Sequence, residues 1–181
     1  MPDTTNATQH ARSPITLRPP ASADGPHLHQ LVRACKPLDE NSIYCNLLQC
    51  THFADTCVAA EQDDELVAFI SGYIPPKQAD TLFVWQVAVS EKARGQGLAK
   101  RMLAELLERD ACAQVRFIET TITPDNDASW AMFRGFARQH KMPAETFILF
   151  DSRIHFAGEH TEEHLLRIGP FNRQASNQQT S

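Results

Sequence analysis

The residues from Arg94 to Ala99, which read Arg-Gly-Gln-Gly-Leu-Ala, have the types and spacing needed to bind phosphate. Gly95 and Gly97 have no side chains, so a ligand can approach the backbone closely there. If a helix begins at this point, its first amides have no partners within the helix, and the helix dipole makes them more positive. The backbone amides of residues 95 to 99 are therefore predicted to hold phosphate oxygens.

An apolar strand and an amphipathic helix are predicted on either side of this run. Residues 82–89 are rich in β-branched and aromatic side chains, which is typical of a buried strand. Apolar residues then recur at helical spacing at Leu98, Met102, Leu103, Leu106 and Leu107. The run is not a Walker loop, because no Gly-Lys-Ser/Thr follows. It is not the dinucleotide fingerprint either, because Lys100 stands where the third glycine is required.

Composition restricts the class of protein. The 181 residues are 42% hydrophobic and 22% charged, which suggests one globular domain with a sizeable core. We expect that domain over residues 14–170, with polar, disordered tails at 1–13 and 171–181. The net charge of −5 argues against nucleic acid or an anionic membrane as the main partner.

The sequence predicts a cytoplasmic protein with reduced thiols. It has no apolar run long enough to span a bilayer, and its first residues lack the apolar segment of a secretory signal. Its five cysteines are odd in number and include no C-x-x-C pair.

The remaining elements predict an α/β fold around a mixed, mostly antiparallel sheet. Further strands are expected at residues 15–18, 56–60, 66–73, 115–123, 147–150 and 165–168. Helices are expected after Asp24, over residues 38–48, and from a cap at 125–127 through Phe133. The hairpin between Cys57 and Tyr73 makes its strands antiparallel, and the helical crossover from Val89 to Val115 makes that pair parallel.

This order of elements, together with the phosphate-binding run, resembles the GNAT superfamily of N-acetyltransferases. Arg94, Gly97 and Ala99 fill the defining positions of its Q/R-x-x-G-x-G/A signature. The resemblance implies acetyl-CoA in the splay between two central parallel strands, with its pyrophosphate on residues 94–99 and its pantetheine arm along Val87 and Val89. Asn126 matches an asparagine that steadies the CoA arm, and helix capping is its alternative role. The alternative for the whole run is a glycine-softened turn before an ordinary helix.

Four further stretches resemble one group within that superfamily, the L-2,4-diaminobutyrate acetyltransferases of ectoine biosynthesis. They are LDENSIYC at residues 38–45, DTLFVWQVAV at 80–89, FIETT at 117–121, and GEH with LLRIGP between residues 158 and 170. The resemblance implies acetyl transfer to the 4-amino group of diaminobutyrate, a role in osmoprotection, and a cytoplasmic homodimer.

Such a reaction needs a carboxylate, because an alkylammonium is no nucleophile until it loses a proton. Glu119 is the first candidate, since it stands inside an apolar strand where a carboxylate is costly without a function. Its alternative is a solvent-facing position near a strand edge. Asp39 and Glu40 are the second candidates, at the start of a predicted helix that covers the acceptor site in GNAT folds. Their alternative is helix capping.

Other side chains are expected to contact the acceptor. Trp85 walls the pocket or packs in the core, and Tyr44 contacts the acceptor, protonates the departing thiolate, or packs along its helix. Many superfamily members carry a tyrosine general acid where this chain has Ala131, so the thiolate leaves with help from Tyr44 or another group, or unaided.

The stretch His160-Thr-Glu-Glu-His164 fits a zinc-peptidase pattern, but no third ligand is placed beside it, and we expect no metal. We interpret it as part of a loop that edges the acceptor pocket, where Glu159, His160 or Glu163 touches the substrate. Two other functions remain open from the sequence. One is acetylation of another amine or a peptide N-terminus, and the other is acyl-CoA binding without catalysis.

Overall fold

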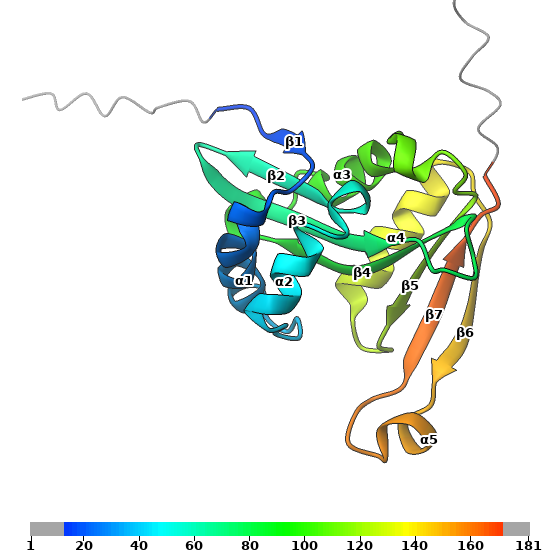
Figure 1. The fold of residues 1–181 in the computed structure, drawn as a ribbon. Coiled ribbons are helices and arrows are strands. Elements are labelled where there is room, and N and C mark those ends of the chain that lie inside the picture. The colour runs from blue at the N-terminus through cyan, green and yellow to red at the C-terminus, as the bar shows by residue number, and fades with distance from the viewer. Residues whose placement is uncertain (1–12, 172–181) are drawn as a thin grey trace, which may run out of the picture.

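A computed structural model describes residues 13–171 and contains one seven-stranded mixed sheet in the order β1-β2-β3-β4-β5-β7-β6 (Figure 1). The strands are β1 Thr16–Arg18, β2 Val58–Gln62, β3 Glu65–Tyr73, β4 Thr81–Val89, β5 Phe117–Ile122, β6 Ala144–Phe150 and β7 Glu163–Ile168. The helices are α1 Gly25–Ala34, α2 Ile43–Gln49, α3 Leu98–Leu107, α4 Asp127–Gln139 and α5 Ser152–Phe156. The predicted mixed sheet and its parallel β4–β5 pair are confirmed.

The expected tails, residues 1–13 and 171–181, lie outside the described residues except for Ser13 and Phe171. The Ser13 carbonyl accepts a hydrogen bond from Gln62 (2.6 Å), and the Phe171 amide donates to the Arg116 carbonyl (3.0 Å). Within residues 13–171, no helix combines the length and apolar character that a membrane span requires.

Helices cover the two faces of the sheet unequally. On one face, Leu28, Leu31 and Val32 of α1 pack on Phe69 and Ala88. On the other face, the apolar stripe predicted for α3 is buried together with α4 and with Val58, Ala60, Ala68 and Ile70 of the sheet. In Figure 1, α1 and α2 lie side by side near β3, whereas α5 lies beyond the ends of β6 and β7. Within residues 13–171, α1 and α2 therefore leave β5, β7 and β6 uncovered on the first of these faces.

The structure corrects three expectations about the helices. The second helix does not begin at Leu38: it begins at Ile43, where the Ser42 hydroxyl accepts from the Cys45 amide at 3.1 Å. Helix α4 continues past Phe133 to Gln139, because Phe133 and Phe136 both face the core. The short α5 was not expected. Its cap is Asp151, which accepts hydrogen bonds from the amides of Arg153 and Ile154.

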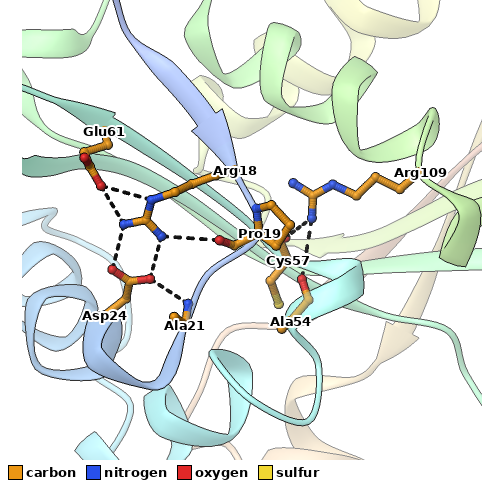
Figure 2. Close-up of polar contacts among 8 residues, drawn as sticks. All are labelled: Arg18, Pro19, Ala21, Asp24, Ala54, Cys57, Glu61 and Arg109. Carbon is orange, nitrogen blue, oxygen red and sulfur yellow. Dashed lines mark hydrogen bonds and ion pairs between the residues drawn. The ribbon is translucent and has the colours of Figure 1, made fainter.

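Two arginines hold irregular segments against the sheet (Figure 2). The Arg18 guanidinium binds both oxygens of Asp24 at 2.7 and 2.9 Å and an oxygen of Glu61 at 2.6 Å. These bonds fix the turn before α1 to β1 and β2. Arg109, after α3, donates to the carbonyls of Ala54 and Cys57 and fixes the segment that leads into β2.

Strand β4 has an irregular course at its centre. Its pairing with β3 passes from Ser71–Gln86 to Gly72–Val84, so Trp85 is an extra residue, a β-bulge. Its parallel pairing with β5 covers only residues 81–83 and 117–119. Beyond Phe83 and Glu119 the two central strands diverge, as the expected splay requires.

Candidate active site

The phosphate-binding run forms a tight loop ahead of α3. Gly95 and Gly97 have φ angles of +76° and +69°, a left-handed conformation that side chains disfavour. The first bond of the helix runs from the Arg101 amide to the Gly97 carbonyl at 3.2 Å. The amides of residues 98 to 100 therefore precede the helical ladder and are available to an anion.

A cavity of about 530 Å³ opens beside this loop. Eight of the nine residues predicted to bind the cofactor line it: Val87, Val89, Arg94, Gly95, Gly97, Leu98, Ala99 and Asn126. Gln96 does not, because its side chain is turned back to donate to the Lys92 carbonyl (3.4 Å). Asn126 caps α4 by accepting from the Ser129 amide at 3.1 Å, so its capping role is present in the structure.

Sequence reasoning missed several residues of this cavity. Lys100 and Lys36 add to the charge of Arg94, and no acidic residue lines this part of the described chain. Cys35 also lines the cavity, and its thiol donates to the Val89 carbonyl at 3.3 Å. A lysine within the signature helix is a detectable signal. Cys35 and Lys36 reach the cavity through the packing of α1, which no local pattern shows.

A second cavity, of about 780 Å³, lies on the uncovered face of the sheet. It contains Trp85 and Glu119, which were predicted for the acceptor, and Thr121 and Arg167, which were not. Its other lining residues are Gln78 and a set of apolar or aromatic side chains that includes Phe53, Tyr73, Phe83, Phe147, Leu149 and Phe150. Trp85 is 46% exposed, so the alternative of core packing is wrong for this residue.

Glu119 is buried at 5% exposure, so it does not face solvent. Its carboxylate accepts a hydrogen bond of 2.6 Å from Arg167, the residue that pairs with it across β5 and β7. The Arg167 guanidinium also stacks over the Phe117 ring at 3.9 Å. The signal that selected Glu119, a charge inside an apolar strand, applies equally to Arg167 within Leu165-Leu166-Arg167-Ile168.

Asp39 and Glu40 were expected to begin a helix, but they lie in the irregular segment before α2. Gln86 donates to the Asp39 carbonyl at 3.0 Å, and its own amide oxygen accepts from Asn41 at 3.1 Å. These bonds hold the segment on the central strand. The Glu40 carboxylate is paired with Lys36 and Arg33.

The acceptor candidates Tyr44, Glu159 and His160 line neither of these two cavities. Tyr44 is 68% exposed on α2 and lines neither cavity, so it is not packed along its helix. Glu159 and His160 line a separate cleft of about 480 Å³ after α5. The His160 ring is hydrogen-bonded to the Thr161 carbonyl and His164 to Glu162, on a loop and a strand rather than on a helix. In residues 13–171, no three His, Cys, Asp or Glu side chains are grouped to hold a metal.

Glu163, another residue predicted to touch the substrate, stands at the start of β7 and follows the cleft residue Glu162. Partial burial raises the pKa of its carboxyl. It lines none of these three cavities.

Comparisons with known proteins agree with this architecture. Residues 26–136 match the acetyltransferase (GNAT) family. The L-2,4-diaminobutyric acid acetyltransferase of Methylotuvimicrobium alcaliphilum is 54% identical over 87% of this chain and 91% of its own length. That of Halomonas elongata is 47% identical over 90% and 84%.

A solved structure is also similar. It is the diaminobutyrate acetyltransferase EctA from Paenibacillus lautus in complex with L-2,4-diaminobutyric acid and coenzyme A. It superimposes with a TM-score of 0.84 at 41% identity, covering 88% of this chain and 98% of the other. The chain therefore belongs to the GNAT acetyltransferase family and, within it, to the L-2,4-diaminobutyric acid acetyltransferases.

Proposed function

We propose that this protein transfers an acetyl group from acetyl-CoA to the 4-amino group of L-2,4-diaminobutyrate. The observation that carries the proposal is the likeness to the Paenibacillus lautus enzyme, which holds that diamino acid and CoA together. We assign the cavity lined by Val87 and Val89 to the cofactor and the cavity lined by Trp85, the bulge residue of β4, to the diamino acid.

In this proposal the cofactor follows the loop and the free edge of β4. Its pyrophosphate binds the amides of residues 95 to 99, and Arg94 and Lys100 balance its charge. Its pantetheine arm lies along Val87 and Val89, where β4 has parted from β5. The thioester then reaches the bulge, where a backbone amide near Val87 stabilises the oxyanion.

The reaction is a direct attack within a ternary complex. Only roughly 0.1% of an alkylammonium is neutral at pH 7, so a carboxylate must take its proton, directly or through water. Glu119, which lines the cavity assigned to the acceptor, and Asp39 are the carboxylates that we propose for this step. The departing thiol has a pKa of about 8.5, so its thiolate leaves without an acid at Ala131, and the exposed Tyr44 is not required for this step.

The protein acts, in our proposal, as a homodimer in the cytoplasm and supplies an intermediate of the osmoprotectant ectoine. Strand β6 is an edge strand whose Phe147, Ile148, Leu149 and Phe150 are 37–53% exposed. An apolar edge of this kind is stable in solution when a second copy covers it. The five free cysteines fit a reducing compartment.

The test is thiol release from acetyl-CoA by the purified protein with diaminobutyrate, lysine, ornithine and spermidine in parallel. We expect strong selectivity for diaminobutyrate, with acetylation at the 4-amino group shown by NMR of the product. Turnover on another amine alone contradicts the substrate but not the acetyltransferase activity. Cofactor binding without turnover on any amine favours a non-catalytic acyl-CoA-binding protein.

A further inference from the structure

Helices α3 and α4 pack against each other beside the cofactor cavity (Figure 1). Lys100, in the first turn of α3, lines this cavity, and so does Ala131 of α4. Gly135 and then Arg138 follow Ala131 at spacings of four and three residues, so the three share one face of α4. This face continues the wall of the cavity farther along α4.

Gly135 leaves room for the Lys100 side chain. It is buried in the interior of α4, where glycine is less favourable than alanine. A Cβ atom on Gly135 would lie 2.6 Å from Nζ and 3.1 Å from Cε of Lys100, which is too close for atoms that are not bonded. The end of the Lys100 side chain therefore lies on α4, in the space that a larger residue would fill.

The Arg138 guanidinium reaches the same place. Its Nη2 atom lies 3.8 Å from the Cβ position of Gly135, so the nitrogens of both cations lie within 4 Å of one point. Among the residues that the structure describes, neither cation has an ion-pair partner. Arg134, one turn earlier on α4, instead lies over the Trp130 ring. Two neighbouring cations repel each other, and an anion that contacts both of them relieves this repulsion.

The geometry points to Lys100 and Arg138 as a second phosphate site, which binds the phosphate on the ribose of coenzyme A. The inference rests on the cofactor position proposed above, in which the loop amides hold the pyrophosphate. Coenzyme A carries its third phosphate on the same adenosine, close to the pyrophosphate. The oxygens of one phosphate can accept charge-assisted hydrogen bonds from an ammonium and a guanidinium together. The protein should therefore distinguish CoA from 3′-dephospho-CoA.

The experiment measures the Kd of CoA and of 3′-dephospho-CoA by isothermal titration calorimetry. Diaminobutyrate is left out, so the result does not depend on turnover. We expect the wild type to bind CoA about 30-fold more tightly, with about tenfold from Lys100 and about threefold from the more exposed Arg138. Lys100→Met and Arg138→Gln should weaken CoA binding by these factors. Both should leave the Kd of 3′-dephospho-CoA within about twofold of the wild type.

Two further variants separate this site from general charge and from stability. Arg101→Gln is the matched control, because Arg101 is exposed next to Lys100 and does not line the cavity. It should bind both ligands as the wild type does. Gly135→Ala displaces the Lys100 ammonium but keeps its charge, so CoA binding should weaken by about threefold to tenfold. Its melting temperature should equal or exceed that of the wild type, because alanine favours a helix interior.

Arg138 also lies in the last turn of α4, where a cation suits the helix dipole. Loss of that structural role alone would lower the melting temperature of Arg138→Gln and would affect the two ligands equally. The ratio of their Kd values therefore reports on the phosphate site and not on the stability of the helix.

Three results overturn the inference. They are equal binding of the two ligands by the wild type, losses in Lys100→Met and Arg138→Gln that are the same for both ligands, or an equal loss in Arg101→Gln. The first result decides the question even if a variant fails to fold. A wild type that acetylates diaminobutyrate but binds both ligands equally overturns only this site. A wild type that prefers CoA about 30-fold but acetylates no diaminobutyrate supports the site and contradicts the proposed substrate.

Discussion

Replacement of Arg167 by Met should destabilise the protein much more than replacement of its partner Glu119 by Gln. The two side chains form one ion pair, but their burial differs: the Glu119 side chain is 6% exposed and that of Arg167 is 28% exposed. Arg167→Met leaves a carboxylate without a partner in a nearly dry position. Glu119→Gln leaves a partly exposed guanidinium that still has an amide oxygen to bind and a Phe117 ring to stack on.

The magnitudes follow from this difference. Removing one partner of a buried ion pair costs about 3–5 kcal/mol when the other charge stays buried. We expect Arg167→Met near the lower end, about 3 kcal/mol, because methionine keeps the apolar contact with Phe117. Glu119→Gln should cost about 1 kcal/mol, the value of a hydrogen bond that changes from charged to neutral. For a chain of this length, 1 kcal/mol is about 2–4 °C in Tm, so Arg167→Met should melt about 6–12 °C lower.

The assay is urea unfolding of the two single variants, the double variant and the wild type, at one pH and protein concentration. If the pair is the cause, the double variant should be more stable than Arg167→Met, because no carboxylate is then left unpaired. The dependence of unfolding free energy on urea should be the same in all four proteins. Equal destabilisation by the two single variants, or strictly additive effects in the double variant, refutes the reasoning.

Three further predictions concern the cofactor loop, the thiols and the turn before α1. Gly97→Ala places a side chain on a residue whose φ is +69°, which should cost about 1 kcal/mol of stability. The KM for acetyl-CoA should rise about tenfold in steady-state assays, and an unchanged KM contradicts the role of the loop. Burial raises the pKa of Cys50 and Cys57 to about 12, so iodoacetamide at pH 8 should label the less buried Cys45 well before either of them. Equal labelling rates of the three thiols, measured by peptide mass spectrometry, contradict this protection by burial. Arg18 lowers the pKa of Asp24, so this carboxylate stabilises the fold above its ordinary pKa near 4, and the stabilisation is lost as the pH falls. Asp24→Asn should melt about 4–8 °C below the wild type at pH 7, and this difference in Tm should close toward pH 2. A difference in Tm that does not depend on pH contradicts the role of the ion pair.

The parts of the fold that were predicted from sequence are those with strong local patterns. The unit of β4, the glycine loop and α3 combines a β-branched run, two glycines and a helical apolar stripe, and all three agree. The segment from Leu38 to Ser42 was misread because it contains several residues that suit a helix start. Hydrogen bonds to Gln86, which is distant in sequence, hold this segment in an irregular conformation on β4. Helix α5 has five residues, none of them buried, so it lacked any apolar periodicity to detect.

The candidate site divides in the same way. The cofactor residues lie within one continuous stretch, apart from Asn126, and the sequence places them together. The acceptor side depends on strand register, which aligns Glu119 with Arg167 across 48 positions of sequence. Register is a property of the assembled sheet, so no pattern near Glu119 shows that its charge is already compensated.

The ladder between β4 and β5 is short, so the sheet consists of two halves that are joined by three paired residues on each strand. Four strands lie on one side of this junction and three on the other. The cofactor position proposed above lies against Val87 and Val89 of β4 on one side and against Asn126 and Met132, which follow β5, on the other, so its binding energy resists separation of the two halves. Acetyl-CoA bound in this way links the two halves of the sheet. Hydrogen exchange at the amides of Val84 to Val89 should slow when acetyl-CoA is bound.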